Sequence, residues 1–185
     1  MEKKLATKNA TDTAVNGFKV FLIGMMGSGK SFWSAKLAKK LKCGSYDLDQ
    51  LIENLEEKSI AEIFAEDGEE YFRKAESKLL RWFGEKKSFV LATGGGTPCL
   101  NNNMDWMNKN GITIWIDESP EILAERLKPA KAHRPLISEL SDNELVDFLN
   151  NKLLERTPAY SQAKYRLSGD KLSEKNIIEI IKQHA

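Results

Sequence analysis

The chain has 185 residues, of which 41% are hydrophobic and 30% are charged, and its formal net charge is +1. This length can bury a substantial core, and the balanced charge gives no electrostatic reason to expect nucleic acid or an anionic membrane as a partner. No apolar run is long enough to cross a bilayer. Cys43 and Cys99 have neither metal-site nor redox spacing, which favours reduced thiols in a cytoplasmic protein.

The first 16 residues are polar and lack the apolar stretch of a signal peptide, so we expect residues 1–16 to be a flexible tail and residues 17–185 to form one domain. Beyond the tail, apolar strand-like runs alternate with helical patterns. This alternation is typical of an α/β fold with a parallel sheet covered by helices on both faces. The expected strands are Phe18–Ile23, Ser45–Asp47, Ser88–Ala92, Ile112–Ile116 and Tyr165–Ser168.

Several expected helices begin at recognisable capping patterns, which are Ser59-x-x-Glu62, Ser119-Pro120 and Ser141-x-x-Glu144. In such patterns a side-chain oxygen accepts from the free backbone N–H groups of the first turn, and proline suits the first helical position. Residues 128–138 contain two prolines and several basic residues between helical patterns. We expect this segment to be a mobile surface loop.

Directly after the first strand lies the most informative motif, Gly24–Ser31, which reads Gly-Met-Met-Gly-Ser-Gly-Lys-Ser. It fits the pattern G-x-x-x-x-G-K-S/T, in which glycines let backbone N–H groups close on phosphate oxygens. Lys30 would reach the terminal phosphates, and the Ser31 hydroxyl could ligate Mg²⁺. The helical pattern from Phe32 to Leu41 adds a helix N-terminus that favours anions. The motif therefore predicts a nucleotide site, with a simple glycine-rich turn as the alternative.

Two carboxylates, Asp47 and Asp49, stand at the end of the second expected strand. Ligands of open parallel sheets bind beyond the carboxyl ends of the strands, and alternation along an extended segment would put both aspartates on one side. One could hold Mg²⁺ through water, while the other orients an attacking hydroxyl or accepts its proton. Alternatively, Asp49 could cap the helical pattern of residues 50–57.

Two later stretches are ambiguous when taken singly. Arg73 and Glu76 lie one helical turn apart within the motif Gly68–Glu76, so their simplest interpretation is a surface ion pair. Gly94–Gly96 follows the very apolar third strand. Three glycines allow a substrate to approach the backbone, although a tight turn from strand to helix is the structural alternative.

Taken in order, these motifs resemble those of the shikimate kinase family from about Phe18 to about Asp170. The matching motifs are Gly24–Ser31, Asp47-Leu48-Asp49, Gly68–Glu76, Gly94-Gly95-Gly96, Arg134-Pro135-Leu136 and Arg156-x-Pro158-x-Tyr160. The resemblance implies a nucleoside-monophosphate-kinase-like P-loop fold, a three-layer, doubly wound, five-stranded parallel sheet with a substrate-binding region at about 47–77 and a lid at about 127–139. The implied activity is transfer of the ATP γ-phosphate to the 3-hydroxyl of shikimate, a step towards chorismate and the aromatic amino acids.

The resemblance also implies roles for individual residues. Catalytic roles are implied for Lys30, Asp49 and Arg134. Nucleotide binding is implied for Gly27, Ser28, Gly29, Lys30, Ser31, Phe32, Arg126 and Arg134. Substrate binding is implied for Asp49, Arg73, Gly94, Gly95, Gly96 and Arg156. The implied cofactor is Mg²⁺ at Ser31 and Asp47, with ATP as co-substrate.

Several alternatives stay open. Arg126 could stack on adenine or could simply complement a helix C-terminus. A related small-molecule kinase, such as a gluconate kinase, would share the loop and fold, and a non-catalytic nucleotide-binding module would share the loop. A GTPase needs an N-K-x-D segment, but residues 108–111 end in glycine where the aspartate must be, which suits a helix stop. We expect a cytoplasmic monomer that acts on small molecules, with no nucleic acid or membrane partner.

Overall fold

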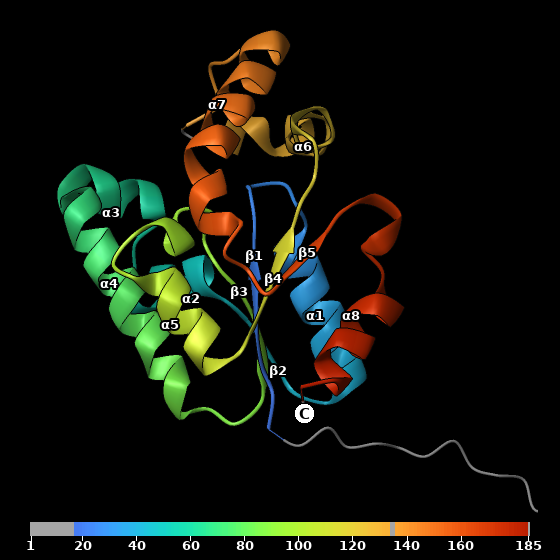
Figure 1. Ribbon diagram of the computed structural model, residues 1–185. Coiled ribbons are helices and arrows are strands. Elements are labelled where there is room, and N and C mark those ends of the chain that lie inside the picture. The colour runs from blue at the N-terminus through green and yellow to red at the C-terminus, as the bar shows by residue number, and fades with distance from the viewer. Residues whose placement is uncertain (1–16, 134–135, 185) are drawn as a thin grey trace, which may run out of the picture.

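The structure is a computed structural model that describes residues 17–133 and 136–184. Its centre is a sheet of five parallel strands in the order β2-β3-β1-β4-β5 (Figure 1). The strands are β1 (Lys19–Ile23), β2 (Gly44–Asp47), β3 (Phe89–Ala92), β4 (Ile112–Ile116) and β5 (Tyr165–Leu167). All five predicted strands are confirmed, with only their end residues differing.

Helices connect the strands and cover both faces of the sheet. The α-helices are α1 (Lys30–Leu41), α2 (Leu48–Glu56), α3 (Ile60–Glu66), α4 (Gly68–Trp82), α5 (Asn103–Asn110), α6 (Pro120–Leu127), α7 (Asp142–Tyr160) and α8 (Glu174–Lys182). Short 3₁₀ helices are η1 (Phe83–Glu85), η2 (Thr97–Cys99), η3 (Lys128–His133) and η4 (Gly169–Lys171). In the two described ranges, none of these helices is both long and apolar enough to cross a membrane.

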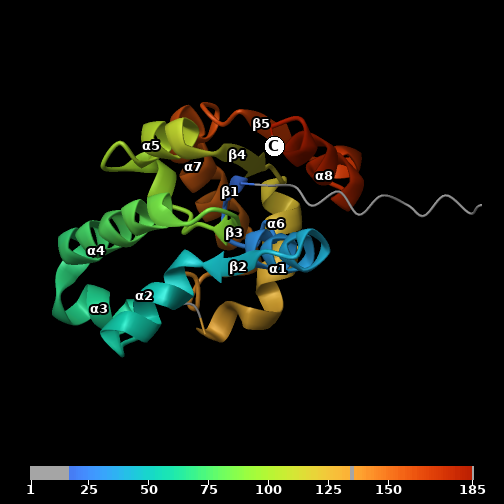
Figure 2. The same cartoon turned by 90° about the horizontal axis from the view of Figure 1, so that it is seen from below.

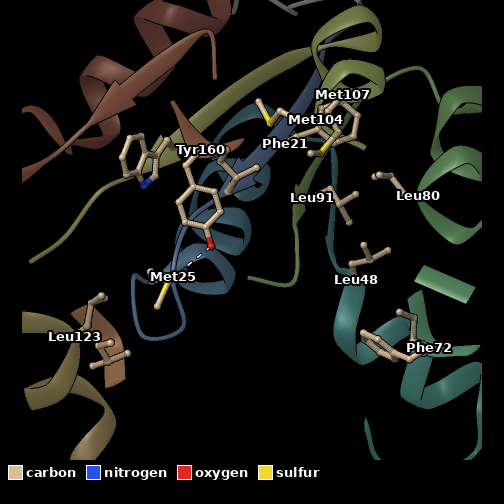
Figure 3. Packing of buried hydrophobic residues seen from close by; sticks show 14 of the residues in the cluster. Phe21, Met25, Leu48, Phe72, Leu80, Leu91, Met104, Met107, Leu123 and Tyr160 are labelled. Carbon is tan, nitrogen blue, oxygen red and sulfur yellow. Dashed lines mark hydrogen bonds between the residues drawn. The ribbon is translucent and has the colours of Figure 1, made fainter. Parts of the chain in front are cut away.

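The sheet separates two apolar clusters, because successive side chains of a strand point to opposite faces. Val20 and Leu22 of β1 pack with α1 and α8, whereas Phe21 and Ile23 pack in the larger cluster with α2 to α7. Figures 1 and 2 show α1 and α8 on one side of the sheet and α2 to α5 on the other. The close-up of the larger cluster includes Phe21 (Figure 3). Burial on both faces explains why the central strands are continuously apolar.

The predicted helix starts are also present. Ser59 and Ser141 each form a complete capping box, at the starts of α3 and α7. Ser119 caps α6, with Pro120 in the first turn. Gly111 ends α5 in an extended conformation, so the chain leaves this helix directly into β4.

The segment predicted to be a surface loop is more regular than expected. It contains η3, and Ile137 is fully buried in the larger cluster. The Lys131 ammonium donates to the Leu140 carbonyl, and Lys128 pairs with Asp142 at 3.0 Å. Apolar burial and local ion pairs thus organise the described part of this segment, and its mobility stays a prediction.

Removal of the α7 cap tests how the fold is stabilised. Ser141→Ala leaves a backbone N–H of the first turn without its side-chain acceptor, so we expect the free energy of unfolding to fall by about 1 kcal/mol. Urea denaturation measures this change. Ser161→Ala at the other end of α7 serves as the control, because its exposed hydroxyl donates to the Pro158 carbonyl at 3.3 Å and caps no helix N-terminus. Equal losses for the two variants would contradict the role assigned to the cap.

Candidate active site

The phosphate loop lies between β1 and α1, at the carboxyl edge of the sheet. Gly24 has φ +143°, and a Cβ atom there would come within 2.5 Å of the Ile116 carbonyl oxygen. Gly29 has φ +90° and immediately precedes α1. Both positions therefore require glycine, because a side chain would be strained at either and would strike backbone at Gly24.

Two polar groups of the loop fit an anionic ligand. The Lys30 ammonium folds over the loop and donates to the carbonyl oxygens of Gly24 at 3.0 Å and Met25 at 2.8 Å. Among the described residues, the hydroxyl of Ser28 is the one buried side-chain polar group without a hydrogen-bond partner. An orphaned buried hydroxyl is costly, and a phosphate oxygen entering the loop could accept its proton.

Asp47 connects the phosphate loop to α2. Its Oδ1 accepts from the backbone N–H groups of Asp49 at 3.1 Å and Gln50 at 3.4 Å, so Asp47 is the N-cap of α2. The alternative that Asp49 caps this helix is wrong, because β2 ends at Asp47 and the helix starts at Leu48. The other oxygen of Asp47 accepts from the Ser31 hydroxyl.

The contact between Ser31 and Asp47 brings together two hard oxygen donors, which suit Mg²⁺. In residues 17–133 and 136–184 there is no cluster of three or more His, Cys, Asp or Glu side chains that could hold a metal on its own. An Mg²⁺ ion at this pair would thus need phosphate and water oxygens as further ligands, which is its usual environment in phosphoryl-transfer sites.

Asp49 lies in the first turn of α2, in a poorly hydrated position among both carboxylates and cations. Burial, and to a smaller degree the neighbouring carboxylates of Asp47 and Glu76, together raise the pKa of its carboxyl to about 6, against the opposing effect of Lys30 and Arg73. Asp49 is therefore ionised at neutral pH but close to its titration range. Such a carboxylate can orient a hydroxyl and can also accept its proton.

The three glycines after β3 bring the other candidate groups together. A Cβ atom on Gly94 would lie 2.6 Å from Asp49 Oδ1. On Gly95 it would lie 2.6 Å from Arg156 Nη1, and on Gly96 it would lie 2.7 Å from Arg73 Nη2. Each glycine thus accommodates one of the three side chains predicted to bind substrate.

Arg73 is held in place by carboxylates of its own helix. Its guanidinium pairs with Glu69 at 3.1 Å and with Glu76 at 3.0 Å. Glu76 is fully buried and also accepts from the Thr97 hydroxyl at 2.5 Å. The interpretation as a surface ion pair is therefore wrong, since Glu76 lies beneath the glycine turn and fixes Arg73 from inside.

Arg156 differs from Arg73 in having no such partner among the described residues. Its side chain is partly buried in the last turns of α7, and Nη1 lies 3.6 Å from Met25 Sδ. No carboxylate forms an ion pair with Arg156 in the part of the chain that the structure describes. A guanidinium in this position is suited to an incoming anion.

A pocket of about 560 Å³ opens beside the phosphate loop. Its walls are Ser28, Gly29, Phe32, Trp33, Glu118, Ile122, Arg126, Gly169 and Leu172. Arg126 Nη2 pairs with the buried Glu118 at 2.9 Å, and Nη1 lies 3.4 Å from the Gly27 carbonyl. Arg126 thus borders the pocket as well as the end of α6, so both interpretations of this residue remain compatible with its place.

The sequence did not single out several of these groups. Glu118, Trp33 and Leu172 come from separate segments that meet only in the folded chain, so no local pattern marks them. Gly27, which the phosphate-loop motif does predict, lies against α6, where a Cβ atom would lie 3.0 Å from Leu127. The remaining predicted site residue, Arg134, lies outside the described residues.

Comparisons with known proteins agree with the motifs. Residues 26–185 match the sequence model of the family described as shikimate kinase. A shikimate kinase from Phocaeicola vulgatus is 41% identical over 161 residues, which cover 87% of this chain and 92% of that protein. One from Flavobacterium psychrophilum is 39% identical over 165 residues, which cover 88% of this chain and 96% of that protein.

Solved structures confirm the expected fold. The shikimate kinase from Bacteroides thetaiotaomicron has a TM-score of 0.79 at 38% identity, covering 90% of this chain and 95% of that one. The Acinetobacter baumannii shikimate kinase, solved in complex with shikimate, has a TM-score of 0.77 at 29% identity, covering 90% and 91%. With the family model matching most of the chain, this protein belongs to the shikimate kinase family.

Proposed function

We propose that this chain is a shikimate kinase that transfers the γ-phosphate of ATP to the 3-hydroxyl of shikimate. The observation that carries this proposal is the gathering of Asp49, Arg73 and Arg156 around Gly94–Gly96, at the same sheet edge as the phosphate loop. Shikimate has a carboxylate and three hydroxyls, so its site needs guanidinium groups for one end and a carboxylate for the other.

The two arginines would bind the carboxylate of shikimate. Arg73 is oriented by Glu69 and Glu76, and Arg156 has no carboxylate partner in the described residues. Gly95 lies against Arg156 and leaves room for a backbone contact with substrate. This arrangement supports an acidic ring as substrate over a neutral polyol.

Asp49 would hold the acceptor hydroxyl. With a pKa of about 6, its carboxyl is ionised at neutral pH and can accept a hydrogen bond from that hydroxyl. Phosphoryl transfer proceeds through a loose transition state, in which positioning and charge neutralisation dominate. We therefore assign Asp49 first to orientation of the hydroxyl and second to acceptance of its proton.

The phosphate loop would hold ATP. Lys30 would exchange its contacts with the loop carbonyls for phosphate oxygens, and the Ser28 hydroxyl would donate to the same group. Ser31 and Asp47 would hold Mg²⁺, which when bound neutralises phosphate charge. The backbone N–H groups of Gly27 and Gly29 and the first turn of α1, which includes Phe32, would complete the cradle.

The pocket beside the loop would receive the base, with Arg126 and Phe32 on its walls. We propose that Arg134 closes over the phosphates as part of the lid at 127–139, by similarity to the family. Exclusion of water there protects the γ-phosphate from hydrolysis. A cytoplasmic, monomeric, single-domain enzyme also remains our proposal, and the alternatives of a gluconate kinase or a non-catalytic module are less favoured by the family match.

Substrate choice is the direct test of this function. A coupled ADP-release assay over a panel of polyols and hydroxy acids should respond to shikimate, and Arg156→Leu should raise the KM for shikimate by about a hundredfold, since a charge-assisted contact is lost. Arg166→Leu is the matched control, because Arg166 pairs with Asp117 away from the glycine turn. Comparable turnover with gluconate would overturn the assignment.

Replacement of Asp49 separates chemistry from nucleotide binding. Asp49→Asn keeps the shape of the side chain but removes its charge, so we expect phosphorylation of shikimate to fall by at least about a thousandfold. Calorimetric titration should find the affinity for ATP nearly unchanged. Retained turnover with weakened ATP binding would contradict the role given to Asp49.

The raised pKa of Asp49 predicts two pH effects. The value of kcat/KM for shikimate should fall as the pH drops through about 6, because Asp49 becomes protonated. A folded-state pKa above the unfolded value favours folding below that unfolded value, and this advantage is lost as the pH rises through about 6. Asp49→Asn should therefore melt a few degrees above the wild type at neutral pH.

This gap in melting temperature should close as the pH falls through 6, because the wild-type carboxyl then becomes neutral as well. Asp147→Asn, an exposed change in the middle of α7, provides the control. A gap that stays constant between neutral pH and pH values well below 6 would show that burial of the Asp49 charge does not cause it.

A further inference from the structure

Tyr160 is the last residue of α7, and no step of the proposed reaction uses its hydroxyl. The side chain is fully buried, and the hydroxyl donates a hydrogen bond of 2.6 Å to the Gly95 carbonyl. Met25 Sδ lies 3.8 Å from the hydroxyl oxygen of Tyr160 (Figure 3). A hydroxyl has one proton and a thioether is a weak acceptor, so the proton is committed to Gly95.

Tyr160 and Arg156 lie four residues apart on α7 and therefore on the same face of the helix. Both meet the same glycine, because a Cβ atom on Gly95 would lie 2.6 Å from Arg156 Nη1. One helix face thus contacts Gly95 at two points, by a hydrogen bond and by the guanidinium. The distance between Gly95 and Arg156 depends on both contacts.

The position of Gly95 also affects its two neighbours. Gly94 lies against Asp49 and Gly96 lies against Arg73, with no side chain of their own to buffer a displacement. A shift of the Gly95 peptide would therefore change the spacing of all three groups proposed to bind shikimate. The hydrogen bond from the buried Tyr160 fixes this peptide, and it therefore controls the geometry of the proposed substrate site from the side of the core.

The environment keeps the Tyr160 hydroxyl in this role. Burial raises the pKa of the hydroxyl, so it stays protonated and remains a donor. The ring packs against Trp115 with centroids 5.6 Å apart, which fixes its direction. Phenylalanine would keep this packing and lose the hydroxyl, with its hydrogen bond to Gly95 and its weaker interactions with Met25 and Arg156.

We propose that Tyr160 is a positioning residue for shikimate, whose hydrogen bond to the Gly95 carbonyl sets the spacing of Arg156, Arg73 and Asp49. This inference rests on the proposed function, since it assigns a role within the same site. A positioning role differs from a packing role in what the loss of the Tyr160 hydroxyl does to substrate binding. Loss of the hydroxyl should weaken binding of shikimate selectively, whatever it does to stability.

The test compares Tyr160→Phe with Tyr165→Phe. The Tyr165 hydroxyl also makes a hydrogen bond of 2.6 Å, but to the exposed His184, on the side of the sheet that α1 and α8 cover. Kinetics at saturating co-substrate give separate KM values for shikimate and ATP, and thermal melting gives the stability of each variant. Assays at low temperature keep a destabilised variant folded.

We expect Tyr160→Phe to raise the KM for shikimate roughly tenfold, as befits one lost buried hydrogen bond, and to leave the KM for ATP within twofold. Tyr165→Phe should change neither value. A lower melting temperature for Tyr160→Phe with an unchanged KM for shikimate would reduce Tyr160 to a packing residue. Equal rises in both KM values would also overturn the proposal.

Should Tyr160→Phe fail to fold, Gly95→Ala carries the test, because the added methyl group displaces the same peptide from Arg156 while Tyr160 is retained. Its KM for shikimate should rise, and a wild-type value would overturn the proposal. The wild type distinguishes the two levels of inference. Without shikimate-dependent ADP release by the wild type, both the function and this role are refuted; with it, a normal Tyr160→Phe refutes only this role.

Discussion

The site depends on a close approach that only glycine permits, at the turn Gly94–Gly96. The parallel register pairs Ala92 at the end of β3 with Asp47 of β2 on one side and with Leu22 of β1 on the other. The turn that follows Ala92 is therefore flanked by the start of α2 and by the phosphate loop. Because the turn has no side chains, Asp49, Arg73 and Arg156 occupy the space that Cβ atoms would fill. The proposed acceptor and donor sites thus become neighbours through sheet topology.

The same crowding makes the site electrostatically unfavourable for Asp49. Asp47 and Glu76 both repel its charge, and burial removes the water that would screen them. The favourable contacts of the two neighbouring carboxylates offset this repulsion. Asp47 caps α2, and Glu76 accepts hydrogen bonds from Arg73 and Thr97. Each neighbouring carboxylate therefore contributes to the fold, which agrees with the proposal that Asp49 serves the substrate. A raised pKa at such a position is typical of functional carboxylates.

The sequence predicted local features well and long-range contacts poorly. Strand positions, the capping boxes and the order of strand, glycine loop and helix follow from patterns within a few residues, and the structure confirms them. The family is also confirmed. By contrast, the burial of Glu76 depends on Thr97 and the glycine turn, which are distant in sequence. Whether Asp47 or Asp49 caps α2 depends on the residue at which β2 ends, and sequence patterns do not locate a strand end to within one or two residues. The pocket walls at Glu118 and Leu172 meet only through the fold, and the roles of the site residues remain predictions.

The two arginines of the proposed substrate site differ in their ion pairing, which suggests different contributions to binding. Arg73 is already compensated by Glu69 and Glu76, so its gain in charge attraction from a second anion is reduced, but its guanidinium is held in one orientation. Arg156 has no ion-pair partner in the described chain and rests near the soft sulfur of Met25. Its charge is available, but its direction depends on the packing of α7 around Gly95. On this reasoning Arg156 contributes most of the attraction for a carboxylate, and Arg73 most of the geometric selectivity. An uncompensated cation attracts many anions, whereas a fixed fork beside it accepts only a carboxylate whose ring also presents a hydroxyl to Asp49.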